Sequence, residues 1–443
     1  MRVSDDRLAY LDQASFLALR ATGLGQLAQW VWRYDRALDV DGLRRFHREL
    51  GAGLLGRRIE TSPLPFGRHR WVTEPRSVPL DFGAAVRPRG EFSDWADERA
   101  QLPIDPEWGP GWQLGVQSFS DGSTGVSLVA SHCLVDGLGG GLAIAAATTG
   151  ERRRLGHPPA GARATWQAVS ADARQTLRDM PDVAGALRSM VRQARGGGQG
   201  DMGRVGGAKP IVAVPERSIV VPAIMIHLPA DEWAARAAAL GGTSNALANA
   251  LAAKIGERLG RLRPDGKVAV RFVVSDRADD DTRANAVSFV AIDVDPTRVT
   301  TDLSDVRATV KRALSELGGE PDESLQVLPM TPFTPKWAVR RMAEALFDDF
   351  SVGCSYLGDV DPATLRPDGT QADTFCARGV TQHITAEVLD RIRGQVTISS
   401  GRYADKVFVT VVGYQVGGEN AKPALRALVA ETLAEFGLRG DID

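Results

Sequence analysis

A glycine-rich segment near the middle of the chain constrains the possible folds more than any other feature. Residues 195–210 read RGGGQGDMGRVGGAKP and have no apolar periodicity, a composition typical of a flexible or extended linker. The segment predicts an N-terminal unit of residues 1–194 and a C-terminal unit of residues 211–443. Each unit is long enough to bury a hydrophobic core without help from disulfides or metals.

The N-terminal unit is expected to mix strands with helices. Residues 30–34 alternate aromatic side chains as a strand does, and residues 125–131 form a second apolar, β-branched strand pattern. The expected helices of this unit cover residues 37–50, 141–147 and 172–195. Asp41 is expected to cap the first of these helices, and Pro181 to interrupt the last.

The C-terminal unit shows the same mixture. Its expected strands cover residues 223–228, 268–274, 287–294, 395–400 and 407–416, and its expected helices cover residues 244–262 and 424–436. The last two strands are separated by a short turn and predict a hairpin. The two units have no detectable sequence repeat, but both predict an α+β fold.

Composition and charge exclude several classes of function. Lys plus Arg number 53 and Asp plus Glu 55, so the net charge is −2 and a nucleic acid is not expected as the main partner. The three cysteines have no C-x-x-C spacing and the histidines have no metal-ligand spacing, so we expect neither a disulfide framework nor a metal site. The chain lacks an N-terminal apolar signal and an apolar stretch that could span a bilayer. A soluble protein of the reducing cytoplasm is therefore expected.

The segment most suggestive of chemistry directly follows the strand pattern at 125–131. Residues 131–137 read SHCLVDG, which places His132 at the end of a rigid element, where a proton-transfer group is needed. A neutral imidazole can act as a base at physiological pH. Asp136 is either a partner of the histidine or an anchor of the turn, and Gly137 permits a positive φ. The alternative is a buried core histidine followed by an ordinary loop.

Cys133, beside the histidine, also has two interpretations. A thiol next to a histidine could be a nucleophile. Strand alternation, however, directs Cys133 to the face opposite His132, where it would pack in the core. We expect the core role.

Residues 131–137 resemble the histidine motif of the CoA-dependent acyltransferase superfamily. This superfamily includes chloramphenicol acetyltransferase, condensation domains of nonribosomal peptide synthetases, polyketide-associated acyltransferases and wax ester synthase/diacylglycerol acyltransferases. Other segments resemble it in the same order along the chain. They are LDQASFL at residues 11–17, SDR at residues 275–277, NAVSF at residues 285–289 and SYLGD at residues 355–359.

The resemblance implies a fold and an activity. The fold would be two chloramphenicol-acetyltransferase-like subdomains in a V-shaped pseudo-dimer, with a tunnel at their interface. His132 would act as the general base that transfers an acyl group from a thioester to a hydroxyl or amine of a small-molecule or lipid acceptor. Acyl-CoA is the favoured donor, and acyl-phosphopantetheine on a carrier protein is the alternative. The resemblance implies no bound cofactor, and a monomer suffices for such a fold.

The resemblance also implies roles for further residues. Asp136 would be structural and pair with an arginine, for which Arg277 is the first candidate and Arg271 the second. Ser355 could help to bind an oxyanion, and His383 could line the tunnel or be structural. Tyr356 stands where relatives often carry asparagine.

One residue of the histidine motif departs from the family pattern. Many relatives have two adjacent histidines, and the first is replaced here by Ser131, whereas the catalytic one is retained as His132. Besides the acyltransferase, two alternatives remain. One is a free-standing condensation enzyme, and the other is a non-catalytic member that recruits a carrier protein.

Overall fold

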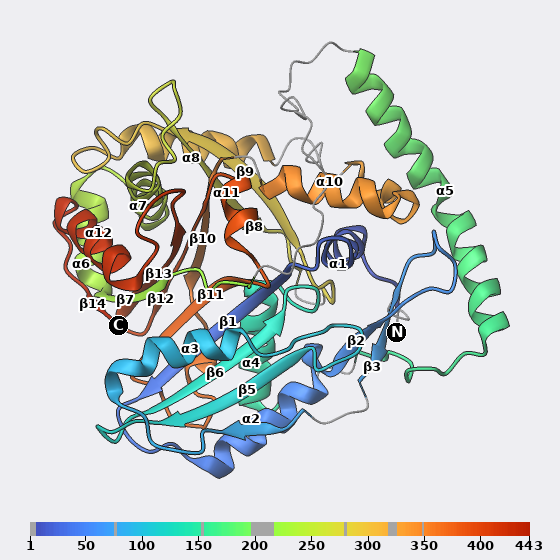
Figure 1. The fold of residues 1–443 in the computed structure, drawn as a ribbon, viewed down its shortest axis with the longest axis horizontal. Helices are drawn as coiled ribbons and strands as arrows, with labels where there is room; N and C mark the ends of the chain where they lie inside the picture. The colour runs from blue at the N-terminus through green and yellow to red at the C-terminus, as the bar shows by residue number, and fades with distance from the viewer. Residues whose placement is uncertain are drawn as a thin grey trace.

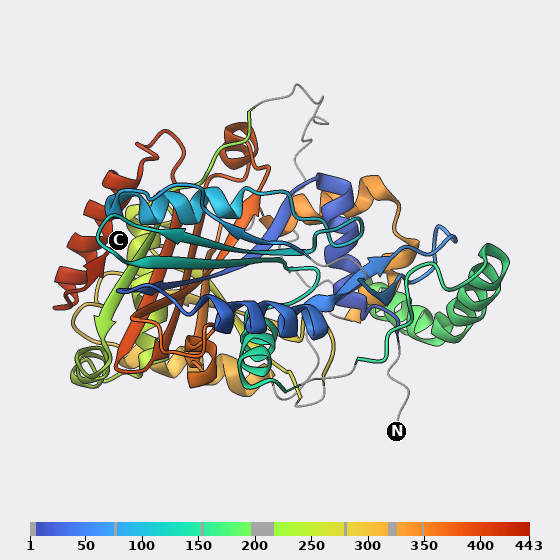
Figure 2. The same ribbon diagram turned by 90° about the horizontal axis from the view of Figure 1, so that it is seen from below.

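The chain folds into a mixed α/β structure with two large sheets, as the α+β pattern predicts (Figure 1). Seen from below, the two sheets lie side by side with helices around them (Figure 2). The predicted linker at 195–210 lies outside the described residues, apart from Arg195. The computed structural model describes residues 6–74, 78–151, 155–195, 217–278, 281–317, 326–347 and 350–443.

The first sheet has five strands in the order β11-β1-β6-β5-β4. Its strands are β1 (Gly25–Tyr34), β4 (Leu80–Phe82), β5 (Trp112–Ser118), β6 (Thr124–Ser131) and β11 (Thr374–Gln382). All pairs are antiparallel except β4 with β5. Strand β11 comes from the C-terminal half of the chain and pairs with β1 from Gly25↔Gln382 to Arg33↔Thr374. The C-terminal half therefore completes the sheet of the N-terminal half.

The second sheet has seven strands in the order β14-β7-β13-β12-β10-β8-β9. They are β7 (Ala223–Pro229), β8 (Val268–Ser275), β9 (Val287–Val294), β10 (Val352–Asp359), β12 (Gln395–Tyr403), β13 (Lys406–Tyr414) and β14 (Asp441–Ile442). The predicted hairpin is confirmed as β12 and β13. Strand β10 runs parallel to both β8 and β12, so the C-terminal ends of these three strands lie at one edge of the sheet.

Helices cover the sheets, and a small antiparallel pair of β2 (Arg57–Glu60) and β3 (Arg70–Thr73) lies beside them. The helices of the first half are α1 (Tyr10–Thr22), α2 (Val40–Ala52), α3 (Phe92–Ala100), α4 (Gly137–Thr149) and α5 (Thr165–Arg195). Those of the second half are α6 (Ala230–Ala239), α7 (Ser244–Arg258), α8 (Ser304–Leu317), α10 (Lys336–Phe347), α11 (Ala386–Arg391) and α12 (Lys422–Glu435). In the described part of the chain, no helix has both the length and the apolar character that a membrane span requires.

Two predicted details of the helices are wrong. Helix α2 is capped by Asp39 rather than Asp41, because the Asp39 carboxylate accepts hydrogen bonds from the backbone N–H groups of Asp41 and Gly42. Helix α5 continues through Pro181 and is not interrupted there. Proline removes one helical hydrogen bond, but the packing of the inner face of α5, which buries Val183 and Ala186, offsets that loss.

His227, buried in β7, makes the stability of the fold dependent on pH. Its Nδ1 lies 2.9 Å from the Tyr403 hydroxyl, and burial lowers its pKa to about 4. An unfolded chain would protonate this histidine near pH 6.5. Between pH 6.5 and 4 the unfolded state therefore binds more protons, and the free energy of unfolding falls as the pH is lowered.

We expect His227 to contribute a loss of about 2 kcal/mol between pH 7.5 and pH 5. Urea unfolding at both pH values, with wild type and His227→Gln, measures this contribution. The variant should lose less stability on acidification than the wild type. His383→Gln, at an exposed histidine, is the control and should retain the wild-type pH dependence. Equal acid sensitivity of wild type and His227→Gln would contradict the assignment.

Candidate active site

His132 lies directly after β6, where the strand turns toward α4. Its backbone N–H donates to the carbonyl of Gln26 in β1 at 2.9 Å, which extends the pairing of the two strands by one residue. The next turn is closed by the N–H of Leu134, which donates to the carbonyl of Ser131 at 2.8 Å. The His132 side chain is half-buried. The end of an interior strand, paired on both sides, therefore positions the imidazole.

Asn285 holds both the backbone and the ring of His132. Its side-chain amide Nδ2 lies 3.1 Å from the His132 carbonyl oxygen, and its Oδ1 lies 2.9 Å from the ring Nδ1. The carbonyl oxygen of His132 can only accept a hydrogen bond, so the NH₂ group of Asn285 must face it. The Oδ1 atom of Asn285 then faces the imidazole ring. Since Oδ1 also only accepts, Nδ1 carries the proton. The neutral ring then has its free lone pair on Nε2, which is the atom available as a base.

Asp12 supports Asn285 from α1. Its carboxylate accepts from the backbone N–H of Ala284 at 2.9 Å, the backbone N–H of Asn285 at 2.8 Å and the Asn285 amide at 3.1 Å. Asp12 is fully buried, and this burial raises its pKa, whereas the hydrogen bonds oppose that shift. The chain Asp12–Asn285–His132 thus joins α1, the β8–β9 connection and the end of β6.

Asp136 pairs with Arg277, the first candidate partner, rather than with Arg271. Asp136 Oδ2 lies 2.7 Å from Arg277 Nη2, and the two side chains are only 3% and 2% exposed. The same oxygen accepts from the backbone N–H of Ala286 at 2.9 Å, while Oδ1 accepts from the N–H of Gly139 and caps α4. The carboxylate therefore anchors the turn. Its partners are Arg277 and the backbone N–H groups of Ala286 and Gly139, and among the described residues it has no hydrogen bond with the ring of His132.

The glycines after Asp136 allow helix α4 to lie close to its neighbours. Gly137 does not adopt the positive φ that the sequence permits, because Asp136 caps α4 and Gly137 directly becomes its first residue. A Cβ at Gly140 would lie 2.1 Å from the ring of Trp30, and one at Gly139 would lie 3.0 Å from Arg277. The small residues thus let α4 pack against β1 and the buried arginine.

Arg57 also supports the turn, and no sequence signal indicated it. This arginine of β2 is 1% exposed, and its guanidinium lies over the ring of Trp71 at 3.9 Å from the centroid. Its Nη2 donates to the carbonyl of Leu134 at 2.8 Å, and its Nη1 donates to that of Thr282 at 2.5 Å. Arg57 therefore connects the turn after His132 to the segment that holds Asn285.

Cys133 packs in the core, as expected. It is buried with Leu8, Phe16 and Trp71, and burial raises the pKa of its thiol to about 12. A thiol with such a pKa has almost no thiolate at neutral pH. The geometry thus disfavours a nucleophilic role for Cys133.

The other predicted site residues lie apart from the hydrogen-bond network of His132. Tyr356, in β10, has a hydrogen bond with Ser244 at the start of α7, and burial raises the pKa of its hydroxyl. The neighbouring Leu357 points toward α4, where it would contact a Cβ at Gly137. Alternation in β10 places Ser355 on the same face as Leu357. His383 is exposed in the turn after β11, with a φ of 60°.

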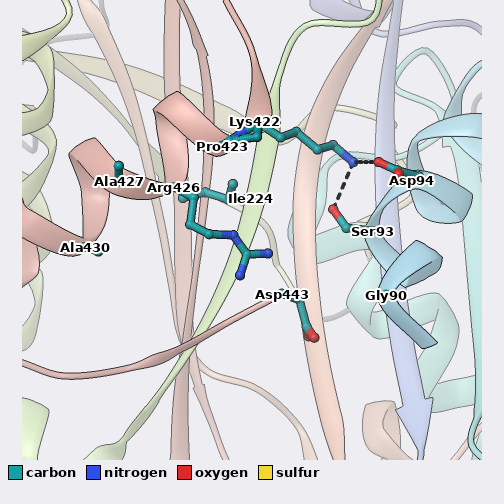
Figure 3. Close-up of a pocket in the computed structure, with 10 residues that line it drawn as sticks. All are labelled: Gly90, Ser93, Asp94, Ile224, Lys422, Pro423, Arg426, Ala427, Ala430 and Asp443. Atoms are coloured by element: carbon teal, nitrogen blue, oxygen red, sulfur yellow. Dashed lines mark hydrogen bonds and ion pairs between the residues drawn. The ribbon is translucent and has the colours of Figure 1, made fainter. Parts of the chain in front are cut away.

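Two cavities lie elsewhere in the structure, and His132 is not among the described residues that line either of them. One, of about 1040 Å³, lies against Tyr356, Trp233 and Arg402 at the edge of the second sheet. The other, of about 460 Å³, lies between α3 and α12 (Figure 3). Beside it, Lys422 of α12 contacts Asp94 at 2.6 Å and Ser93 at 3.0 Å in α3, and these contacts tie the two halves together (Figure 3).

Comparison with known proteins finds similar structures but no similar sequences. No protein-family model matches the chain, and no curated protein matches it in sequence. Solved structures match over nearly its whole length. The first condensation domain of the CDA synthetase matches at 16% identity and a TM-score of 0.56, over 99% of this chain and 100% of that one.

Two further structures match in the same way. The wax ester synthase/diacylglycerol acyltransferase from Marinobacter aquaeolei VT8 matches at 15% identity and a TM-score of 0.55, over 98% of each chain. Polyketide synthase associated protein 5 from Mycobacterium tuberculosis matches at 14% identity and a TM-score of 0.53, over 97% of each chain. The chain therefore shares the fold of these structures, which are the kinds of protein that the resemblance in sequence indicated.

Removal of the Asp136 carboxylate should destabilise the protein. Asp136→Ala leaves Arg277 buried without its charged partner, a change that costs about 3–5 kcal/mol. Urea unfolding measures the effect. Adding Arg277→Met should recover part of the loss, because the two residues act on one interaction. The control Asp359→Ala breaks the exposed pair with Arg402 and should change the stability little. A fully stable Asp136→Ala would contradict the anchoring role.

Removal of the Asn285 amide should release the ring of His132. In wild type at alkaline pH, where the imidazole is neutral, ¹⁵N spectra of histidine-labelled protein should show His132 with its proton on Nδ1. In Asn285→Ala the two tautomers should interconvert, because nothing at Nδ1 selects between them. Asn420→Ala, in the turn before α12, is the control and should leave the His132 signals in place. A proton on Nε2 in the wild type would overturn the assignment.

Proposed function

We propose that this protein is an acyltransferase in which Nε2 of His132 is the general base. The observation that carries the proposal is the hydrogen bond between His132 Nδ1 and Asn285 Oδ1, which leaves Nε2 as the acceptor. The donor is a thioester, with acyl-CoA favoured, and the acceptor is a hydroxyl or amine of a small molecule or lipid. The superfamily fold supports this class of reaction.

The reaction follows from the position of the base. Nε2 removes the proton of the acceptor hydroxyl or amine while the acceptor oxygen or nitrogen attacks the thioester carbonyl carbon. The tetrahedral intermediate then collapses, the carbon–sulfur bond breaks, and the imidazolium returns its proton to the leaving thiolate. No covalent enzyme intermediate is required. General-base catalysis of this kind contributes about 10²–10⁴-fold.

The remaining residues have supporting roles in this proposal. Asp136, Gly137 and Arg277 hold the turn that presents His132 and do not touch the substrates. Ser355 is the candidate that stabilises the oxyanion, since alternation in β10 puts it on the same face as Leu357, whose side chain lies beside Gly137. Tyr356 and His383 remain candidate lining residues of the substrate tunnel. The donor and acceptor would enter this tunnel from opposite ends of a V-shaped pair of subdomains, with the protein working as a cytoplasmic monomer.

A donor bound to a carrier protein is the main alternative to acyl-CoA. The solved neighbours include condensation domains as well as a wax ester synthase/diacylglycerol acyltransferase, and both kinds match this fold equally well. Acyl-CoA and an acylated carrier protein share the phosphopantetheine thioester, so the chemistry at His132 is the same for both. A non-catalytic, carrier-binding protein is the third alternative, and the retained His132, Asp136 and Gly137 argue against it.

Thiol release from acyl-CoAs of increasing chain length, with a mixture of alcohols and amines, tests the proposal. Wild type should release thiol only in the presence of acceptor, and His132→Ala should be slower by about 10²–10⁴-fold. Asp41→Ala, which breaks an exposed pair with Arg44, is the matched control and should keep the wild-type activity. Circular dichroism establishes that each variant is folded.

Each result of this assay has a definite meaning. Full activity of a folded His132→Ala would exclude His132 as the base. Release from an acylated carrier protein but not from acyl-CoA would assign the donor to the carrier-bound class. Silence with both donors would favour the non-catalytic alternative.

A further inference from the structure

The long helix α5 has an exposed apolar stripe that nothing in the proposed reaction uses. The helix lies along the outer edge of the molecule (Figures 1 and 2). Successive helical residues are rotated by about 100°, so residues spaced by three, four and seven share one side. The large apolar residues that are exposed at this spacing are Trp166, Val169, Leu177, Met180, Leu187 and Val191. Trp166 is 72% exposed and Leu177 is 71% exposed.

A basic stripe runs beside the apolar one. Its members are Arg174, Arg178, Arg188 and Arg192, which are all exposed and lie within about 80° of one another around the helix axis. Among the described residues, none of these four arginines forms an ion pair with an acidic side chain. The outer side of α5 is therefore both apolar and cationic.

Two of the three aspartates of α5 are buried on its inner face and form ion pairs, whereas the third, Asp182, is exposed and accepts a hydrogen bond from the Tyr10 hydroxyl at 3.1 Å. Asp172 contacts Arg7 at 2.6 Å and Arg163 at 3.0 Å, and Asp179 contacts Arg68 at 3.3 Å. The carboxylates thus attach the helix to the body of the protein. Asp172 and Asp179 do not neutralise the outer arginines, because they lie on the inner side of the helix.

Helix α10 shows the same combination of side chains close to α5. Trp337 is 66% exposed, Met342 is exposed as well, and both Lys336 and Arg341 are exposed beside them. The helix lies on the same side of the molecule as α5 in both views (Figures 1 and 2). The combination of exposed tryptophan, aliphatic and basic side chains therefore extends beyond a single helix.

We propose that the outer side of α5, together with α10, binds an anionic lipid surface. An amphipathic helix with tryptophan and leucine on one side and arginine beside them lies in the plane of a membrane interface, with its apolar stripe among the acyl chains. The arginines then reach the anionic headgroups. The helix rests on the surface and does not cross it. This inference does not depend on the chemistry of His132.

Charge favours a lipid surface over a second copy of this chain. In a pair of α5 helices the arginines beside one apolar stripe would meet those beside the other, and like charges would repel. A surface with negative headgroups is complementary to the same arrangement. Single exposed apolar residues are common on soluble proteins, but a continuous stripe of them marks an interaction site.

Flotation of the full chain with lipid vesicles tests the proposal. The protein should float with vesicles that contain phosphatidylglycerol and much less with vesicles of phosphatidylcholine alone, and the binding should weaken with salt. The variant Trp166→Ser/Leu177→Ser/Leu187→Ser should lose at least about tenfold in affinity, because it removes apolar side chains from the stripe. Replacement of each outer arginine by glutamine should reduce the affinity by about fivefold.

The control variant changes exposed apolar residues on another face. Phe82→Ser/Val86→Ser alters side chains near β4 that are 43% and 64% exposed, and it should bind like the wild type. Thermal unfolding establishes that all variants are folded. Fluorescence quenching by brominated lipid gives a second readout, which should decrease in Trp166→Phe.

Three outcomes would overturn the proposal. The first is the absence of flotation with every vesicle type. The second is that the protein floats equally with neutral and anionic vesicles and that the arginine variants float to the same extent as the wild type. The third is a concentration-dependent dimer in analytical ultracentrifugation that the apolar triple variant dissociates, which would assign the stripe to a second copy. Loss of thiol release in solution would bear on His132 and leave this inference intact.

Discussion

The buried carboxylate of Asp136 is the interaction on which the geometry of the candidate site depends. One side chain caps α4, accepts from the backbone of Ala286 and neutralises Arg277. These three partners come from the two halves of the chain, so the turn after β6 and the β8–β9 connection cannot move independently. A buried ion pair adds little net stability by itself, because desolvation offsets the attraction. Its effect here is to allow only one arrangement of the segments around His132.

The second half of the chain contributes to the site by position rather than by a reacting group. Ala284, Asn285 and Ala286 each bond to Asp12 or Asp136, and Asn285 also holds the histidine ring. Strand β11 adds a further link, since it completes the first sheet next to β1, whose Gln26 accepts from the backbone of His132. A base held at both its backbone and its ring loses little freedom on binding substrate, which is the condition for efficient proton transfer.

Prediction from the sequence succeeded where the pattern is local. Strand β9 was predicted with its observed bounds, because its exposed and buried residues alternate from Phe289 to Val294. Strand β11 was not predicted, because it buries Arg378, which forms an ion pair with Asp97 and donates to the side-chain oxygen of Gln29, both from the other half. In the site, resemblance indicated His132, Asp136 and Arg277. The roles of Asp12 and Asn285 depend on hydrogen bonds between segments that are distant in the chain. The role of Arg57 depends on its burial. A single sequence displays neither property.

The overall charge of −2 conceals a marked separation of charge within α5. Counted along the sequence, the aspartates of this helix offset much of its arginine charge. In the folded protein Asp172 and Asp179 turn inward to arginines of the body, and their contribution to the outer surface disappears. Folding thus converts a helix of mixed composition into one with a cationic, apolar outer side. Net charge therefore excludes a strongly basic protein but says nothing about a basic face, because that face depends on which side of the helix packs.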